Sequence, residues 1–313
     1  MRVAGVDVGG TNIQVGLVDA DHTVIDRAKR ATPPEGADAV VTAIAEMVAS
    51  LKDSVSAVGV GIPGVVDEGE VVVVPNLSNW TDDVDLVGLL EEALGLPITV
   101  GNDVNAGLHG EWIAGAARGC DDVLGVWMGT GIGGAMVLDG RPFTGSAGGA
   151  GELGHMIVRA NGALCGCGRR GCIEAYAGRR SMGLTVQAMV EAGRPTSMLE
   201  IQQELGASRP TSKVWAAAIG RGDPLATQVF DEGIEALGIG IASAINLIDV
   251  ELVVVGGGLV EKMGSDLTDR IAEAAAPHMM RPNPGLAWVP AVLGDDSGVV
   301  GAAELARAAA TTP

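Results

Sequence analysis

Short apolar runs alternate with longer, helix-like periods through the first part of the chain. Continuous apolar runs bounded by Gly, Pro or Asn predict buried strands, and apolar residues at helical spacing predict amphipathic helices. The predicted strands are Val3–Val8, Ile13–Val18, Val55–Ile62 and Ile98–Val100. The predicted helices are Ala37–Leu51, Leu86–Leu94 and Val104–Ala114.

The same pattern starts again at Val123. A strand over Val123–Met128 is followed by a glycine turn and a second strand over Ala135–Leu138, and aligning the two cycles pairs Gly9 with Gly129 and Asp19 with Asp139. This self-similarity indicates a duplicated domain. Later segments add a strand at Leu252–Val255 and helices at Arg180–Ala192, Asp223–Leu247 and Gly298–Ala310. The order of elements predicts an α/β protein with two related domains.

Charge and length limit the kinds of partner. The 313 residues are enough for two domains, and the net charge of −19 argues against a nucleic-acid-binding surface, which needs clustered Lys and Arg. The acidic bias fits either simple solubility or a salt-rich cytoplasm. The N-terminus has no signal-peptide pattern and no apolar run is long enough for a membrane helix, so a cytoplasmic protein without a membrane partner is expected.

Two strand-linked glycine turns have the composition of phosphate-binding loops. The first is Asp7-Val8-Gly9-Gly10-Thr11-Asn12, and the second is Gly129-Thr130-Gly131-Ile132-Gly133-Gly134, which lacks the acid. Glycines let main-chain N–H groups approach an oxyanion, and Asp7 could hold Mg²⁺ through water. Either turn alone could be an ordinary hairpin, and neither is a Walker A loop. A third glycine segment, Gly256-Gly257-Gly258, follows another buried strand, and together the three outline a nucleotide site.

A polar pair, Asn102-Asp103, follows the strand at Ile98–Val100 and starts the next predicted helix. Asn and Asp are favoured N-caps, so either residue could simply begin that helix. A carboxylate at this position could also act as a general base. The residues alone leave both roles open.

The cysteines give the most specific signal. Glu152-Leu153-Gly154-His155 is followed by Cys165, Cys167 and Cys172, with Glu174 next to them. One His and three Cys suit a closed tetrahedral Zn²⁺ site, which would be structural because no coordination position stays open. The alternative is a set of free thiols with a core histidine. If one nitrogen of His155 binds zinc, the other is left as an N–H donor, and Glu152 and Glu174 flank it as acceptors.

Together, the paired turns, the third glycine segment and the cysteine cluster resemble the ROK family of sugar kinases and repressors, over almost the whole chain. The resemblance implies the actin-like, ribonuclease-H-type ATPase fold with an interdomain cleft. It implies a smaller N-terminal domain, residues 1–117 plus 298–313, and a larger domain, residues 118–297, that carries the zinc loop. ATP, Mg²⁺ and structural Zn²⁺ are the implied cofactors, and a homodimer or homotetramer is the implied assembly.

The resemblance also assigns roles to residues. Asp103 would be the general base, and the implied sugar-binding residues are Gly64, Asn79, Asn102, Asp103, Glu152, His155 and Glu174. The implied nucleotide-binding residues are Asp7, Gly9, Gly10, Thr11, Asn12, Thr130, Gly131, Gly133, Gly134, Gly256, Gly257 and Gly258. His155, Cys165, Cys167 and Cys172 would hold the zinc. Asn79 is taken from Pro75-Asn76-Leu77-Ser78-Asn79-Trp80, which resembles a sugar-proximal stretch of the family.

The expected reaction is ATP-dependent phosphorylation of a hexose, with glucose at its 6-hydroxyl as the leading substrate. Fructose, mannose, allose and N-acetylhexosamines stay open as substrates, as does polyphosphate as donor. A sugar-responsive regulator is disfavoured because Asp7 comes too early for a preceding DNA-binding helix-turn-helix. A glycosidase pair made of Glu152 and Glu174 is disfavoured by the phosphate turns.

Overall fold

The computed structural model describes residues 1–51, 53–67, 70–73, 77, 79–80 and 84–311. The chain folds into two compact units. Unit 1 comprises Met1–Asp121, Ala135–Ala150 and Val292–Pro313, and unit 2 comprises Asp122–Gly134 and Gly151–Ala291. Residues 118–121, 135–150 and 292–297 therefore group with the N-terminal part of the chain, whereas the sequence-based boundaries place them in the larger domain.

Unit 1 is built on a five-stranded sheet of order β3-β2-β1-β4-β7. Strand β1 pairs antiparallel with β2 and parallel with β4, and β4 pairs parallel with β7. The strands are β1 (Val3–Val8), β2 (Asn12–Val18), β3 (Val24–Ala31), β4 (Val58–Ile62) and β7 (Ile98–Asn102). A separate hairpin pairs β5 (Val65–Asp67) with β6 (Glu70–Val73).

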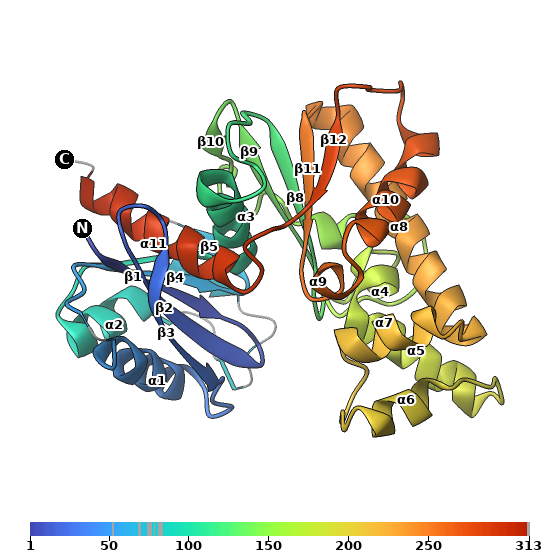
Figure 1. Cartoon of the computed structure of the whole chain (residues 1–313), viewed down its shortest axis with the longest axis horizontal. Helices are drawn as coiled ribbons and strands as arrows, with labels where there is room; N and C mark the ends of the chain where they lie inside the picture. The colour runs from blue at the N-terminus through green and yellow to red at the C-terminus, as the bar shows by residue number, and fades with distance from the viewer. Residues whose placement is uncertain (52, 68–69, 74–76, 78, 81–83, 312–313) are drawn as a thin grey trace. The chain divides into compact units, whose positions relative to one another are not determined.

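Alternation along β1 sends side chains to two different helical layers. Val6 and Val8 belong to the core that contains buried residues of α1 (Ala37–Ala49) and α2 (Leu86–Leu94). Val3 packs in the other cluster, with residues of α11 (Asp296–Thr311). Helix α3 (Asp103–Ala114) packs on α11, so α1 and α2 cover one face of the sheet and α3 and α11 cover the other (Figure 1).

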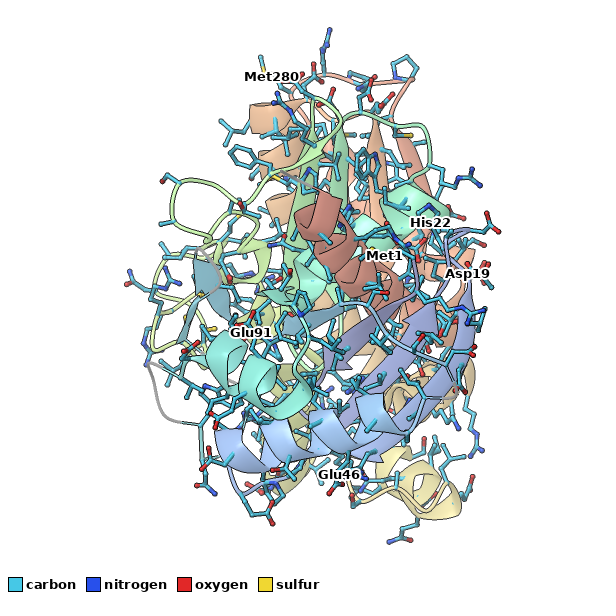
Figure 2. The ribbon with its side chains drawn as sticks, turned by 90° about the vertical axis from the view of Figure 1, so that its left-hand side faces the viewer. Met1, Asp19, His22, Glu46, Glu91 and Met280 are labelled. Atoms are coloured by element: carbon cyan, nitrogen blue, oxygen red, sulfur yellow. The ribbon has the colours of Figure 1, made fainter. Side chains whose placement is uncertain are left out.

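Both ends of the chain meet in unit 1. Arg307 of α11 donates hydrogen bonds to the main-chain oxygens of Met1 (2.7 Å) and Asp19 (2.7 Å). Its Nε also donates to Glu304, which forms an ion pair with His22 in the turn before β3. Figure 2 shows Met1, Asp19 and His22 close together, while Glu46 of α1 and Glu91 of α2 lie on the outer side of their helices. These contacts hold α11 against the first two strands.

The second five-stranded sheet has the order β10-β9-β8-β11-β12. Strand β8 pairs parallel with β11, and β11 pairs parallel with β12, whereas β9 and β10 are antiparallel. Its strands are β8 (Val123–Met128), β9 (Ile132–Leu138), β10 (Arg141–Pro142), β11 (Leu252–Gly256) and β12 (Ala287–Pro290). The two sheets therefore place corresponding strands in the same order, as the internal repeat predicts (Figure 1).

The helices of unit 2 are mostly clustered around the long α8 (Figure 1). They are α4 (Glu174–Ala177), α5 (Arg179–Glu191), α6 (Met198–Glu204), α7 (Ser212–Gly220), α8 (Pro224–Ile248), α9 (Val260–Met263) and α10 (Ser265–Ala275). Single 3₁₀ turns lie at Leu153–His155 and Ala276–His278. None of the helices in the described part of the chain has the length and apolar character needed to cross a membrane.

Most predicted elements are found within a few residues of their expected ends. The elements absent from the sequence-based prediction are β3, β5, β6, β10, β12, α4, α6, α7, α9 and α10. The prediction also starts the strand β9 at Ala135, whereas the structure starts it at Ile132. Gly133 and Gly134 therefore lie inside a strand and not in the preceding turn. A methyl group on Gly134 would lie 2.6 Å from the oxygen of Gly151, so packing accounts for that glycine.

Candidate active site

The first glycine turn joins β1 to β2 and brings Asp7 to the end of β1. The N–H of Gly9 donates to the oxygen of Asn12 at 2.9 Å, which closes the turn tightly. Gly5 and Asp7 point to the same face of the sheet as Val3, toward α11. A side chain at Gly298, near the start of α11, would lie 2.9 Å from Cγ of Asp7. The carboxylate is thus covered by the start of the last helix.

The surroundings of Asp7 are acidic. The pKa of the Asp7 carboxyl is raised to about 7, mainly by burial and then by the negative charges of Asp103 and Asp295, while Lys29 acts in the opposite direction. Lys29 of β3 lies 2.9 Å from Asp295, and Arg27 lies 3.2 Å from Asp296. A divalent cation would relieve this concentration of negative charge, so the donor set fits the predicted Mg²⁺.

Asn102 and Asp103 occupy the end of β7 and the start of α3. The side-chain oxygen of Asn102 accepts from the N–H of Asn105 at 2.9 Å, so Asn102 is the N-cap. Its side-chain nitrogen donates to the oxygen of Gly64 at 2.8 Å. Asp103 is the first helical residue, and one of its oxygens accepts from the N–H of Val104 at 2.9 Å. The cap and the predicted base are therefore adjacent residues, and one role does not exclude the other.

Gly64 and Asn79 also belong to unit 1. Gly64 has a φ of 118°, a conformation that favours glycine. Asn79 adopts a left-handed φ of 52°, and its side-chain nitrogen donates to the oxygen of Pro34 at 2.8 Å. Three other residues of the predicted sugar-proximal stretch, Pro75, Asn76 and Ser78, lie outside the described residues.

The second glycine turn, in unit 2, joins β8 to β9. It is closed by a 3.0 Å hydrogen bond from the N–H of Gly129 to the oxygen of Gly131. The hydroxyl of Thr130 accepts from Arg179 at 3.2 Å. The third glycine segment follows β11, and Gly257 there has a φ of 95°. A methyl group on Gly256 would lie 2.8 Å from the Trp127 ring, so this segment runs along the end of β8.

The four predicted zinc ligands come together in unit 2. The imidazole of His155 and the sulfurs of Cys165, Cys167 and Cys172 present ligand atoms that all lie within 4.8 Å of one another. The Sγ of Cys165 is 3.7 Å from Nδ1 of His155, and the sulfurs of Cys167 and Cys172 are 3.8 Å apart. Tetrahedral zinc, with bonds of about 2.3 Å to sulfur and about 2.0 Å to nitrogen, separates its ligands by roughly 3.5–3.8 Å. The residues therefore fit a structural zinc ion.

The thiols are not electrostatically equivalent. Burial raises the pKa of Cys165 to about 12. Burial acts in the same direction on Cys167, but hydrogen bonds from Arg169 and from the two other thiols outweigh it and lower the pKa to about 6. The lowered pKa of Cys167 favours its thiolate, which is the form of cysteine that binds metal.

His155 presents its two nitrogens to different groups. Nδ1 faces the cysteines, whereas Nε2 lies 3.9 Å from the carboxylate of Glu152, too far for a direct hydrogen bond. Glu152 is half-exposed, at 47% for its side chain. A ligand hydroxyl could therefore reach both Nε2 and the carboxylate.

Glu174 connects the metal loop with the second glycine turn. One carboxylate oxygen accepts from the N–H of Ile132 at 3.0 Å, and the other lies 3.8 Å from the sulfur of Cys165. A side chain on Gly131 would overlap this carboxylate. Glu174 leaves no room for a side chain at position 131, which explains the glycine there. The sequence spacing of the two residues does not predict this contact.

Comparison with known proteins identifies the family of the chain. The sequence matches the ROK family over residues 3–309. The chain belongs to the ROK family. It is 33% identical to a glucokinase of Thermotoga maritima over 98% of both chains. It is 30% identical to the N-acetylgalactosamine kinase AgaK of a Shewanella species, over 96% of this chain and 95% of the relative.

A solved structure gives the same picture. The ROK glucokinase of Streptomyces griseus, in complex with glucose and AMPPNP, superposes with a TM-score of 0.87 at 35% identity, over 98% of this chain and 100% of the other. This ROK protein accordingly has the actin-like ATPase fold and is a sugar kinase, as the sequence resemblance predicts. The identity of the sugar is not fixed by the comparisons, since ROK relatives of similar identity carry different names.

The sequence-based set lacks several residues that lie beside the predicted site. Lys29 and Asp295 contribute to the charge around Asp7. Arg179 lies beside the second glycine turn, and Ser212 lies beside Gly258 of the third glycine segment. Lys29 and Arg27 lie in the mostly charged run Asp26-Arg27-Ala28-Lys29-Arg30 of β3, which lacks the apolar alternation that would have predicted a strand. The pairing of Arg179 with Ser212 joins two separate helices and leaves no local signal.

Proposed function

We propose that this ROK kinase transfers the γ-phosphoryl group of ATP to the 6-hydroxyl of glucose. The observation that carries the proposal is full-length similarity to glucokinases, one of which is described with glucose and an ATP analogue bound. The chain retains residues of suitable chemistry for each part of the reaction. Asp103, the proposed proton acceptor, lies close enough to Asp7 to raise the pKa of Asp7, and the carboxylate of Glu152 lies 3.9 Å from Nε2 of His155.

In the proposed reaction, Asp103 accepts the proton of the 6-hydroxyl as the new O–P bond forms. The bond between the γ-phosphorus and the bridging oxygen breaks, and ADP leaves with the electron pair. Asn102, Asn79 and the main chain at Gly64 would bind ring hydroxyls and align the attacking oxygen. Orientation contributes more to this reaction than basicity, so Asp103 needs no raised pKa.

On the second unit, Glu152, Glu174 and Nε2 of His155 would bind the remaining sugar hydroxyls. Zinc held by His155 and the three cysteines would fix the imidazole tautomer with Nε2 as a donor. The glycine turns, with Thr11, Asn12 and Thr130, would donate to the phosphates of ATP, and Gly256–Gly258 would border the adenosine. Mg²⁺ held near Asp7 would neutralise phosphate charge.

The proposal is tested by ADP release from the purified protein with ATP and a sugar panel. The panel comprises glucose, mannose, fructose, allose and three N-acetylhexosamines, and 6-deoxyglucose is the matched control because it lacks only the accepting hydroxyl. We expect release with glucose to exceed release with the others, and none with 6-deoxyglucose. A higher kcat/KM with an N-acetylhexosamine would reassign the substrate in favour of the relationship to AgaK.

The phosphoryl donor is tested in the same assay by replacing ATP with polyphosphate. A chain with 20 basic and 39 acidic residues is poorly suited to bind a long polyanion, so we expect little product with polyphosphate. Comparable glucose phosphorylation from both donors would contradict this choice.

A further inference from the structure

Arg179 occupies an unusual position at the start of α5. Helix α5 begins there, directly after Gly178, and the N–H of the next residue, Arg180, donates to the main-chain oxygen of Thr130 at 3.0 Å. The guanidinium of Arg179 donates to the hydroxyl of the same Thr130 at 3.2 Å. Main chain and side chain thus both fix the start of α5 against the second glycine turn.

The same guanidinium reaches the third glycine segment. Nη1 of Arg179 donates to the hydroxyl of Ser212, at the start of α7, at 2.7 Å. A methyl group on Gly258 would lie 2.8 Å from that hydroxyl and 3.8 Å from Nη1 of Arg179. The positive charge therefore lies between the turn predicted to bind phosphates and the segment predicted to border adenosine.

This cation has no negative partner among the residues that the structure describes. Its two side-chain partners, Thr130 and Ser212, are neutral hydroxyls that occupy two of the five guanidinium N–H donors. Burial lowers the pKa of Arg179, and the positive charge of Arg209 lowers it further. A partly buried guanidinium held only by neutral groups, close to a second cation, is poised to bind an anion.

We propose that Arg179 binds the phosphate chain of the nucleotide donor, at the α- and β-phosphates. The inference rests on the proposed kinase function and adds a residue to it. The geometry favours these phosphates because Arg179 donates to Thr130 of the second glycine turn and lies near Gly258 of the third segment, whereas the γ-phosphate must lie at the reacting hydroxyl. The guanidinium can donate two parallel hydrogen bonds to phosphate oxygens, which lysine cannot do.

The role predicts a specific pattern of binding by two probes, ADP and adenosine. Arg179→Gln keeps a hydrogen-bonding side chain of moderate length but removes the charge. Hydrogen bonds to a charged group contribute about 1.5–3 kcal/mol, so ADP should bind roughly 10–100-fold more weakly by calorimetry. Adenosine affinity should change less than about threefold, because adenosine lacks the phosphates that Arg179 would bind.

Arg180→Gln is the matched control. Arg180 is the exposed neighbour, and its main-chain contact with Thr130 survives the substitution, so ADP affinity should stay near that of the parent protein. Arg179→Lys retains the charge without the paired donors, and it should bind ADP with intermediate affinity. If Arg179→Gln folds poorly, the ADP affinity of Arg179→Lys still tests the proposal.

Two results would overturn the role of Arg179. One is unchanged ADP affinity in Arg179→Gln and Arg179→Lys. The other is an equal loss of ADP and adenosine affinity, which would make Arg179 a ribose-binding or purely structural residue. Failure of the proposed function is distinguishable, because the parent protein would then neither bind ADP nor release it from ATP in the presence of sugar.

Discussion

The two glycine turns join corresponding strands of similar sheets, but the charged residues next to them have opposite signs. Both join the first two strands of a repeat, in sheets with the same strand order, and both are closed by one short main-chain hydrogen bond. The turn of unit 1 lies next to Asp7, which interacts with Asp103 and Asp295, whereas the turn of unit 2 lies next to Arg179. The repeat thus keeps its backbone, while the charged residues beside it differ: carboxylates lie beside one turn and a guanidinium lies beside the other.

If this division holds, substitutions beside the first turn should act mainly on turnover, and substitutions beside the second should act mainly on nucleotide affinity. The variants at Arg179 test the second half of this statement. The following four predictions test the first half and the zinc loop, from the largest expected effect to the smallest.

Asp103→Asn should have the largest effect. Loss of a positioned general base lowers kcat by roughly 10²–10⁴-fold, while glucose and ADP should still bind within a few-fold of the parent affinities. Turnover is measured by ADP release, and binding is measured by calorimetry. Asp21→Asn, in an exposed turn of the same unit, is the control and should turn over normally. Near-normal turnover in Asp103→Asn would remove this residue from the mechanism.

Asp7→Asn should abolish most activity and yet stabilise the protein when Mg²⁺ and nucleotide are absent. The folded-state pKa of about 7 exceeds the ordinary value of 3.8, so the folded protein binds this proton more tightly than the unfolded chain does. The free energy of unfolding of the parent must then fall as pH rises from about 4 to about 7.

In the Asp7→Asn variant this residue cannot ionise, so the free energy of unfolding should not fall in this way as pH rises. Denaturant unfolding should show a gain of roughly 2–4 kcal/mol above pH 7 that disappears toward pH 4. A stability difference that did not vary with pH would mean that Asp7 is not held in its neutral form by burial. The combination of lost turnover and gained stability would identify Asp7 as a residue kept for function.

Removal of one zinc ligand should affect sugar more than nucleotide. Cys172→Ser should lose the single equivalent of zinc, lower the melting temperature and reduce kcat/KM for glucose by roughly 10–100-fold, because His155 and Glu174 lose their support. Cys120→Ser is the control, since Cys120 lies outside the ligand cluster. Metal analysis of the parent below about half an equivalent of zinc would contradict the zinc assignment.

Lys29→Met should give the smallest effect. Lys29 lowers the pKa of Asp7, so its removal should shift the acid limb of the kcat/KM profile to higher pH. The pair with Asp295 is half-exposed, which limits the shift to roughly a few tenths of a pH unit. Arg27→Met, which removes the neighbouring pair with Asp296, is the comparison and should leave the profile in place.

Local pattern was enough to predict most of the structural frame of the site. Val3–Val8, the turn after it and the Asn102–Asp103 helix start could be read from the sequence because apolar runs, glycines and capping residues act over a few positions. The cysteine cluster could be read as well, since its ligands lie close together in the chain. Glycine usually marks a turn, which is why the sequence predicts a turn at Gly133 and Gly134, whereas the structure has them in β9. The close approach of Gly151 to Gly134 accounts for the missing side chain there.

The features of the site that the local sequence pattern could not predict depend on contacts between residues far apart in the chain. The pKa of Asp7 depends on Lys29 and Asp295, which reach it only once β3 and α11 are in place. The link from Glu174 to Ile132 crosses 42 positions, and that from Arg179 to Ser212 crosses 33. No periodicity of the sequence encodes such pairs, because each depends on the packing of separate elements.

The close packing of α11 on Gly5 of β1 and Gly59 of β4 has a consequence for biosynthesis. Side chains at Gly5 and Gly59 would overlap main-chain atoms of Val299 and Ala302, so the helix lies with its backbone directly on the strands. Arg307 and Met1, which its side chain holds, are 306 positions apart. The first strands to leave the ribosome must therefore wait for one of the last helices before their apolar face is covered. Nascent chains that stall before α11 would expose Val3 and Val18 and should be preferred clients of chaperones and proteases.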